Sequence, residues 1–220
     1  MSPSKSVAVA ASLACCATAV LAPAAAAQGS VTQDSVTQGS VPVSFACRAK
    51  PPLLPAQEFV QQSSITADAP ASVAPGSVFT STSQTDAMQA PAELNGQKIK
   101  ALKDIRFRAK LPGNATFVSI ALSGGSNLGP GKPTATHVDG HVVETAPGPI
   151  AGGSTFQLPK GTLQLKAGAS GVMERRVGGT SYDDPGLTFT AEVKVLLLTV
   201  DVPVACYPKP SPVTHRITIR

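Results

Sequence analysis

The sequence has few of the residues that build several common kinds of binding site. It contains no tryptophan and only two tyrosines, Tyr182 and Tyr207. A platform on which sugars or nucleobases stack needs aromatic faces, so we do not expect one. Charged residues make up 14% of the chain, against roughly a quarter in an average soluble protein. The net charge of +5 is scattered, and because nucleic-acid binding needs a denser basic patch, we expect no nucleic-acid partner.

Motifs of the common catalytic and phosphate-binding sites are also missing. The sequence has no G-x-S-x-G motif, which marks the nucleophile of many serine hydrolases. Its glycine-rich spots, such as Gly124-Gly125-Ser126, lack the spacing and the Lys-Ser/Thr end of a P-loop. Long amphipathic helices are absent as well, and residues 84–94 are the best candidate for a helical turn. We therefore expect a protein that is not an enzyme and binds no cofactor.

The first 27 residues have the pattern of a secretory signal peptide. Lys5 precedes an apolar run, and Ala25-Ala26-Ala27 provides a small-residue cleavage site. A retained membrane anchor is one alternative, although a proline interrupts the run and no basic flank follows it. Lipidation at Cys15 or Cys16 is another. We expect cleavage, a mature chain without a transmembrane helix, and a location that is secreted, extracellular or in the cell envelope.

Residues 28–41 carry a polar repeat in which Ser-Val-Thr-Gln occurs twice. The segment has no apolar face to bury, so we expect a flexible linker. A short edge strand is the alternative, because valine and threonine favour strands. The remaining residues, 42–220, are expected to form a single β-sandwich domain.

From residue 42 onward the dominant period of the sequence is two. Apolar residues alternate with polar ones in four long segments, with the apolar-side sets Val43-Phe45-Cys47, Ile105-Phe107-Ala109-Leu111, Leu187-Phe189-Ala191-Val193-Val195 and Val213-His215-Ile217-Ile219. This alternation is typical of antiparallel sheets that turn one face toward a core. Turn signals such as Asn95-Gly96 separate the segments. The sequence therefore predicts an all-β, antiparallel β-sandwich.

One stretch changes the phase of this alternation. Leu196, Leu197 and Leu198 are consecutive; the apolar set is odd-numbered before them and even-numbered from Val200 to Cys206. A β-bulge in one long strand would shift the phase by one residue. A central strand that is buried on both faces is the alternative.

Cys47 and Cys206 are the two cysteines that remain after cleavage. An exported protein meets an oxidising compartment, and two cysteines allow one intramolecular pairing. We therefore expect a Cys47–Cys206 disulfide rather than two buried free thiols. In the chain-entropy model, closing a loop of this length stabilises the fold by at most about 4–5 kcal/mol.

His137, Asp139 and His141 have a spacing that would place three metal ligands on one face of a continuous strand. However, Asp139-Gly140 is a strong two-residue hairpin turn. In that hairpin His137 pairs with Val142, so the two histidines point to opposite faces of the sheet. We therefore favour the hairpin and expect no metal site, with these three residues as the alternative ligands.

Arg106, Arg108 and Lys110 form a basic stripe on one predicted strand face, which could dock an acidic polymer. Such charges more often cover the solvent face of a sheet or protect an edge strand. Residues 174–176, Glu-Arg-Arg, are interpreted as a solvated rim. His215 lies on the apolar side of the last segment and is expected to be a packed or half-exposed histidine.

Residues 69–79, with the sequence APASVAPGSVF, resemble the opening strands of bacterial immunoglobulin-like surface modules. The alanine-rich export signal and the bias toward Ala, Pro, Gly and Thr resemble secreted envelope proteins of high-GC Gram-positive bacteria. The resemblance implies an immunoglobulin-like β-sandwich in an extracellular setting. It carries no functional residue over to this chain, because a fold does not fix a function.

Together these features predict a secreted or cell-envelope-associated, non-catalytic protein with a binding or structural role. Its expected partners are cell-envelope components or another protein. An oligomeric envelope pore subunit is one alternative. A second is a hydrolase with an unfamiliar site built from His137, His141, Asp183 or Asp184.

Overall fold

The computed structural model describes residues 35–52, 54–94 and 96–220, and none of these residues lies in a helix. The expected signal peptide, residues 1–27, falls outside this part of the chain. The first strands are β1 (Ser35–Ala49), β2 (Gln57–Pro70), β3 (Ser72–Val73), β4 (Val78–Thr85), β5 (Met88–Gln89) and β6 (Glu93–Leu94). The middle strands are β7 (Gln97–Lys110), β8 (Ala115–Ser123), β9 (Thr134–Val138), β10 (His141–Ala146), β11 (Ile150–Ala151) and β12 (Thr155–Phe156). The last strands are β13 (Lys160–Ala167), β14 (Gly171–Val177), β15 (Leu187–Val195), β16 (Leu198–Pro208) and β17 (Val213–Ile219).

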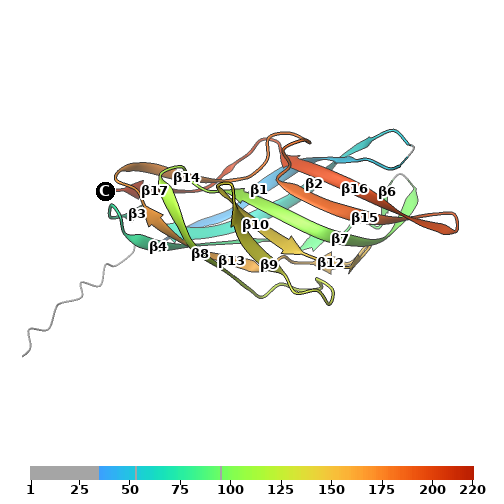
Figure 1. Cartoon of the computed structure of the whole chain (residues 1–220), viewed down its shortest axis with the longest axis horizontal. Helices are drawn as coiled ribbons and strands as arrows, with labels where there is room; N and C mark the ends of the chain where they lie inside the picture. Colours follow the sequence, from blue (N-terminus) through green and yellow to red (C-terminus); the bar gives the residue numbers. More distant parts are fainter. Residues whose placement is uncertain (1–34, 53, 95) are drawn as a thin grey trace, which may run out of the picture. The chain divides into compact units, whose positions relative to one another are not determined.

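Most of these strands belong to one hydrogen-bonded sheet. Its order is β3-β17-β14-β7-β15-β16-β1-β2-β4-β13-β8, and the β9–β10 hairpin joins β7 through β10 (Figure 1). The pairing of β17 with β3 is parallel, whereas the other pairings of the described strands are antiparallel. The prediction of an all-β, largely antiparallel fold is therefore confirmed.

The first strand begins earlier than the sequence predicted. Residues 35–41, expected in a flexible linker, belong to β1, where Ser35 pairs with Pro70 at the far end of β2. This part of the expected linker is therefore a strand, the alternative that its valine and threonine content favoured. Residues 28–34 lie outside the described residues.

The alternation of apolar residues predicts the buried faces well. On β7 the side chains of Ile105 and Ala109 are buried, and on β16 those of Val202 and Val204 are buried. The helical turn expected within residues 84–94 is wrong. This segment is extended and contributes the end of β4, then β5 and β6, because its backbone pairs with other strands.

The run of three leucines is the turn of a hairpin. Val195 pairs with Leu198, so β15 and β16 are two antiparallel strands joined by Leu196 and Leu197. Both the predicted β-bulge and the predicted doubly buried strand are wrong here. Across a two-residue turn each odd-numbered residue pairs with an even-numbered one, as Val193 does with Val200. The side chains that face inward are therefore odd-numbered on β15 and even-numbered on β16.

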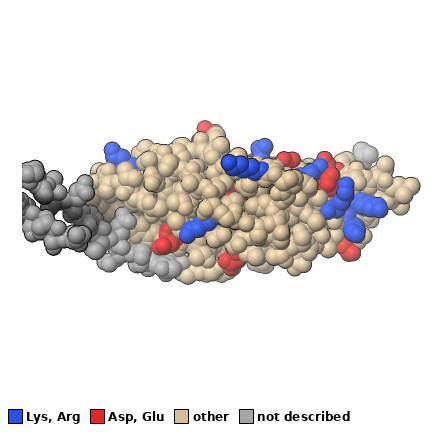
Figure 2. Space-filling view, turned by 90° about the horizontal axis from the view of Figure 1, so that it is seen from below, with Lys and Arg blue, Asp and Glu red and all other residues tan. Residues whose placement is uncertain are grey.

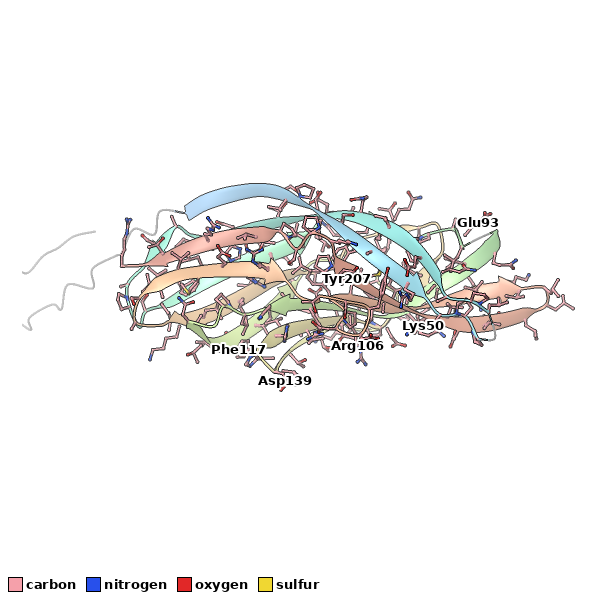
Figure 3. All side chains as sticks on the ribbon, turned by 90° about the horizontal axis from the view of Figure 1, so that it is seen from above. Lys50, Glu93, Arg106, Phe117, Asp139 and Tyr207 are labelled. Atoms are coloured by element: carbon pink, nitrogen blue, oxygen red, sulfur yellow. A yellow bond between two sulfur atoms is a disulfide. The ribbon has the colours of Figure 1, made fainter. Side chains whose placement is uncertain are left out.

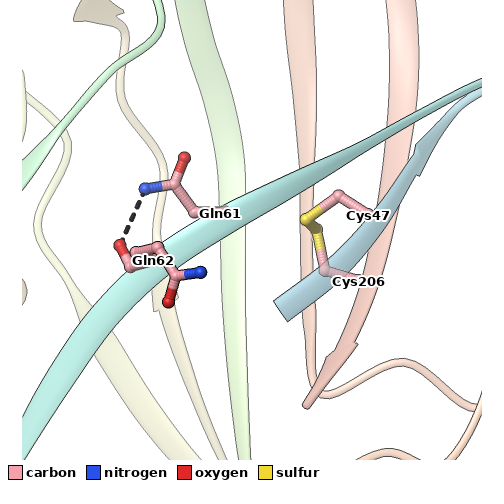
Figure 4. The surroundings of a disulfide bond; sticks show 4 residues. All are labelled: Cys47, Gln61, Gln62 and Cys206. Carbon is pink, nitrogen blue, oxygen red and sulfur yellow. Dashed lines mark hydrogen bonds between the residues drawn. A yellow bond between two sulfur atoms is a disulfide. The ribbon is translucent and has the colours of Figure 1, made fainter. Parts of the chain in front are cut away.

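The two cysteines lie directly opposite each other on neighbouring strands. Cys47 of β1 pairs with Cys206 of β16, and their sulfur atoms form the expected disulfide (Figure 4). Both residues are completely buried. In immunoglobulin domains the conserved disulfide joins the two sheets, whereas this one joins hydrogen-bonded neighbours. The immunoglobulin-like arrangement remains a prediction.

The described residues form one compact unit with two apolar clusters. The larger cluster includes Phe45, Ile105 and Val204, and the smaller one includes Phe79 and Ile217.

Polar side chains occupy the inward positions between the two clusters. On β14, Arg175 lies between Met173 of the smaller cluster and Val177 of the larger one; on β10, Glu144 lies in the same way between Val142 and Ala146. We use the name interior polar layer for the set Ser81, Thr85, Glu144, Arg175 and His215.

Candidate binding site

The hairpin predicted from Asp139-Gly140 is present with the predicted register. His137 pairs with Val142, and both turn residues have positive φ, 48° for Asp139 and 71° for Gly140. The ring of His137 stacks on Phe117 with centroids 4.4 Å apart. His141 uses Nδ1 in a 2.9 Å hydrogen bond with the carbonyl oxygen of Asp139. Over the described residues, no three His, Cys, Asp or Glu side chains are grouped so that they could hold a metal ion.

The three cations of the predicted basic stripe lie on the outer face of β7 but have different surroundings. Arg106 and Lys110 are exposed. Arg108 Nη1 donates a 2.8 Å hydrogen bond to Asp184 Oδ1 and a 3.0 Å bond to the carbonyl oxygen of Pro185. The bond from Arg108 is the main cause that lowers the pKa of Asp184. Arg108 therefore holds a loop in place, and the stripe does not act as three free charges.

Arg106 instead belongs to an open groove on the sheet. The groove has a volume of about 560 Å³ and crosses β7, β15, β16 and the end of β1. Its basic lining residues are Arg48, Lys50 and Arg106, and Lys50 and Arg106 lie near each other in Figure 3. Pairing of β1 with β16 and of β15 with β7 brings these residues together from positions far apart in the sequence.

Arg48 forms the structured wall of the groove. Its Nη2 and Nε donate hydrogen bonds of 2.8 and 3.1 Å to Glu58 Oε1. Its guanidinium also lies 3.9 Å from the ring centroid of Tyr182, and that ring packs edge-on against Tyr207 at 5.1 Å. Burial, and then the negative charge of Glu58, raise the pKa of Tyr182. Tyr182 therefore packs against a residue of the groove wall, and Tyr207 packs edge-on against Tyr182.

Lys50 and Arg106 are the free cations of this groove. Across the described part of the chain, neither has a carboxylate oxygen within ion-pair distance. Thr188 and Thr190 add hydroxyl groups to the lining, and Asp104 adds one negative charge. Two unpaired cations beside hydroxyl groups can hold carboxylate or phosphate groups by charge-assisted hydrogen bonds. The open form of the groove leaves room for an extended polymer.

A second polar arrangement lies in the interior polar layer. Ser81 Oγ is 3.0 Å from His215 Nε2, and Arg175 Nη1 donates a 3.2 Å hydrogen bond to the same oxygen. Arginine can only donate, so Ser81 Oγ accepts from Arg175. Thr214 Oγ1 donates its proton to the carbonyl oxygen of Arg175, so its 3.5 Å contact with His215 Nδ1 favours a neutral imidazole protonated at Nδ1, whose Nε2 accepts a hydrogen bond from Ser81. Burial, and then the charge of Arg175, lower the pKa of His215 to about 4. Burial also lowers the pKa of Arg175 to about 10, so it stays charged at neutral pH.

This Ser–His pair is not arranged for catalysis. A nucleophilic serine needs an imidazole that can accept its proton and an acidic group that stabilises the resulting cation. Here the neighbouring group is a cation, and Ser81 is completely buried. The prediction that residues 174–176 form a solvated rim is wrong for Arg175, whose exposed fraction is 5%. Its side chain points inward because residues of β14 alternate between the two faces.

The residues of the hydrolase alternative have separate local partners. Asp184 accepts hydrogen bonds from Arg108 and from Thr180 Oγ1, the latter at 3.0 Å. The backbone nitrogens of Asp183 and Asp184 donate to Ser181 Oγ, which makes this segment a turn. His141 lies near enough to lower the pKa of Asp184, but His137 is stacked on Phe117. These contacts describe a turn and a hairpin rather than one assembled reaction centre.

Sequence reasoning found Arg106 but missed Arg48 and Lys50. These two residues stand at the end of β1, and their spacing in Arg48-Ala49-Lys50 places both on one strand face. That spacing was the available signal. It does not tell which other strand lies beside β1.

Comparisons with known proteins agree with the fold and give no family. The sequence matches no protein-family model and no curated protein. One similar solved structure is the "Putative membrane anchored protein" from Corynebacterium diphtheriae, a high-GC Gram-positive bacterium, with a TM-score of 0.58 and 16% sequence identity. The match covers 83% of this chain and 38% of that one, so this chain spans well under half the length of its structural neighbour. No helix of the length and apolarity needed to cross a membrane occurs among the described residues.

Proposed function

We propose that this chain is an exported, non-catalytic protein of the cell envelope that binds an anionic envelope polymer in the groove lined by Arg48, Lys50 and Arg106. The observation that carries the proposal is the pair of unpaired cations, Lys50 and Arg106, in an open groove of about 560 Å³. A repeating acid can contact both cations at once, which strengthens binding beyond that of a single site. The fold similarity to a protein described as membrane anchored supports an envelope location.

The buried disulfide and the signal-like first 27 residues support export. Disulfides form and persist outside the cytosol, and the Cys47–Cys206 bond is completely buried. Intact mass of the protein from culture supernatant and from envelope fractions tests this part. We expect a chain that begins at Gln28 and gains two alkyl groups only after reduction. A lipid on Cys15 or Cys16, or an uncleaved chain, would replace the proposal with a different mode of attachment.

Polymer binding can be measured through the tyrosines beside the groove. Polygalacturonate serves as a carboxylate polymer and inorganic polyphosphate as a phosphate polymer. We expect saturable changes in tyrosine fluorescence with at least one of them, because Tyr182 stacks on Arg48. The double variant Lys50→Gln/Arg106→Gln should bind about tenfold more weakly, since each of the two lost ion contacts in this solvated groove is worth up to about 1 kcal/mol.

A matched variant separates a specific groove from general attraction. Lys160→Gln/Lys166→Gln removes the same charge from exposed positions of β13. Its affinity for the polymer should stay within about twofold of the wild type. Equal losses in the two double variants would contradict the proposed groove and leave only attraction by net charge.

A further inference from the structure

The turn between β15 and β16 exposes three consecutive leucines. The exposed fractions are 88% for Leu196, 97% for Leu197 and 70% for Leu198. Single exposed apolar residues are common on soluble proteins, but a contiguous exposed group marks an interaction surface. The β15–β16 hairpin extends to the far right of Figure 1. Its turn consists of Leu196 and Leu197, because Val195 pairs with Leu198.

The geometry of the turn does not account for leucine at this place. Leu196 has a φ of 53°, in the left-handed region. Two-residue hairpin turns usually place glycine or asparagine at such a position, because a side chain with a Cβ atom is strained there. A strained leucine with an exposed fraction of 88% gains little from burial inside the described chain. Packing within the fold therefore does not explain an apolar side chain at this position.

The strand ends behind the tip are basic. Val193 of β15 pairs with Ile99 of β7, so Lys194 and Lys98 are cross-strand neighbours, and both are exposed. Figure 2 shows Lys and Arg side chains gathered just behind this end. The nearby acids Glu192 and Asp201 are occupied by Lys103, each at 3.2 Å, which leaves Glu93 of β6 as the exposed acid beside Lys98.

A further apolar surface lies beside the same strand ends. Leu54, with an exposed fraction of 61%, lines an apolar pocket of about 150 Å³ together with Val195 and Val200. The apolar tip, this neighbouring apolar surface and the two lysines behind the tip follow one another along the hairpin. That order matches the acyl region and the headgroup region of a lipid bilayer.

We propose that the β15–β16 tip inserts into the interface of an anionic lipid bilayer, with Leu196, Leu197 and Leu198 among the acyl chains and Lys98 and Lys194 at the headgroups. A second copy of the chain is the less favoured occupant. A stable protein interface buries about 1,200 Å² or more, and a convex turn of three side chains offers too little area for that. A bilayer accepts a convex tip without a matching surface.

The proposal can be tested by measuring how the exported form of the protein binds to lipid vesicles. The probes are large vesicles of phosphatidylglycerol and phosphatidylcholine in equal parts, and vesicles of phosphatidylcholine alone. The variant Leu196→Gly/Leu197→Asn/Leu198→Thr removes the apolar surface and installs a preferred turn sequence, so the hairpin should be at least as stable as before. We expect its partition onto anionic vesicles to fall about tenfold.

The headgroup contact has its own test. Lys98→Gln and Lys194→Gln should each lower partition onto anionic vesicles about fivefold and leave partition onto neutral vesicles unchanged. Val172→Ser changes an exposed valine of β14 and serves as the control for loss of apolar surface. This control should bind vesicles as well as the wild type.

Insertion itself can be seen because the chain has no tryptophan. Leu197→Trp places a single tryptophan at the tip, and its emission should shift to the blue and be quenched by brominated lipid. A single tryptophan from Val172→Trp should stay exposed to water. Unchanged emission at position 197, or full vesicle binding by the triple variant Leu196→Gly/Leu197→Asn/Leu198→Thr, would overturn the proposal. So would self-association without vesicles that this variant abolishes, which would assign the tip to a second copy.

Discussion

At the scale of single residues, the least expected feature is a charged arginine inside the fold without a carboxylate partner among the described residues. Arg175 has an exposed fraction of 5%, and its Nη1 donates to Ser81 Oγ. The carbonyl oxygen of Arg175 accepts a 3.0 Å hydrogen bond from Thr214 Oγ1. A buried charge is tolerated only where hydrogen bonds compensate for lost water. Ser81 is therefore important for the burial of both side chains, because its Oγ is hydrogen-bonded to Arg175 and to His215.

Replacement of Ser81 should destabilise the fold. In Ser81→Ala, both Arg175 Nη1 and His215 Nε2 lose their partner, which costs about 1–3 kcal/mol for each buried group left unsatisfied. Urea unfolding of the variant and the wild type measures the difference. Thr80→Ala, on the exposed face of the same strand, should change stability by less than about 0.5 kcal/mol. Equal stability of Ser81→Ala and the wild type would show that the network does not stabilise the fold.

At the scale of elements, two hairpins with two-residue turns behave differently. Asp139-Gly140 has the preferred turn sequence and positive φ at both positions. Leu196-Leu197 makes a turn of the same length without any preferred residue. The first turn could be predicted from its residues. The second could not, because apolar residues carry no turn signal. The one trace of this turn in the sequence is that the apolar positions change from odd-numbered to even-numbered residues.

The β9–β10 turn should be sensitive to its glycine. Gly140 has a φ of 71°, and a Cβ atom there is strained by about 1–2 kcal/mol. Gly140→Ala should lower the free energy of unfolding by that amount. The matched control is Gly113→Ala, because this glycine lies outside the left-handed region and its Cβ would meet nothing within 4 Å. Equal effects of the two substitutions in a denaturant titration would rule out backbone strain as the cause.

At the scale of the whole described unit, two apolar clusters share one continuous sheet and are separated by polar side chains. Long strands connect the clusters: β2 contributes Ile65 to the larger one and Ala69 to the smaller one. The disulfide lies in the larger cluster and closes a separation of 159 residues between β1 and β16. Most of the fold is therefore enclosed in the loop that this bond closes.

Loss of the disulfide should lower stability without changing the strand pairing. In the double variant Cys47→Ala/Cys206→Ala, the chain-entropy model gives a loss of at most about 4–5 kcal/mol. The backbone pairing of β1 with β16 should persist, because it depends on hydrogen bonds on both sides of the cysteines. Guanidinium unfolding measures the loss, and circular dichroism checks the strands. A loss of strand signal in the absence of denaturant would contradict this view.

The pH dependence of stability should reflect two opposing groups in the interior polar layer. His215 has a pKa lowered to about 4, so it contributes stability above its ordinary value of 6.5 that is lost as the pH falls toward 4. Burial raises the pKa of Glu144 to about 7, so it contributes stability below its ordinary value of 4.5 that is lost as the pH rises toward 7. The two slopes have opposite signs over an overlapping range.

Removal of one group should reveal the slope of the other. Glu144→Gln removes the loss of stability that Glu144 causes as the pH rises. Between pH 4 and 6.5 the free energy of unfolding of this variant should therefore rise with pH by up to about 3 kcal/mol more than that of the wild type. Denaturant titrations at several pH values in this range measure both curves. Identical pH profiles for the variant and the wild type would mean that Glu144 does not titrate in the folded interior.

The long alternating strands, their buried faces, the Asp139-Gly140 hairpin and the cysteine pair could be predicted from the sequence alone. These features depend on local alternation, on turn preferences and on the presence of two cysteines after the first 27 residues. Each can be read from neighbouring residues or from a count. For the same reason, the alternation placed His215 correctly on the inward face of β17, where it is buried.

Which strands lie beside one another could not be predicted from the sequence and is known from the fold. The groove needs the end of β1 next to β16 and Arg106 of β7 next to β15, and the interior polar layer needs Ser81 of β4 opposite Arg175 and His215. A period of two tells which side of a strand is buried, but it carries no information about the partner strand. Pairing over such separations depends on the sum of packing and hydrogen bonding in the whole fold. The alternation therefore predicted the inward side of β17 correctly. The burial of Arg175 and the exposure of the leucines at the β15–β16 turn were found only in the folded structure.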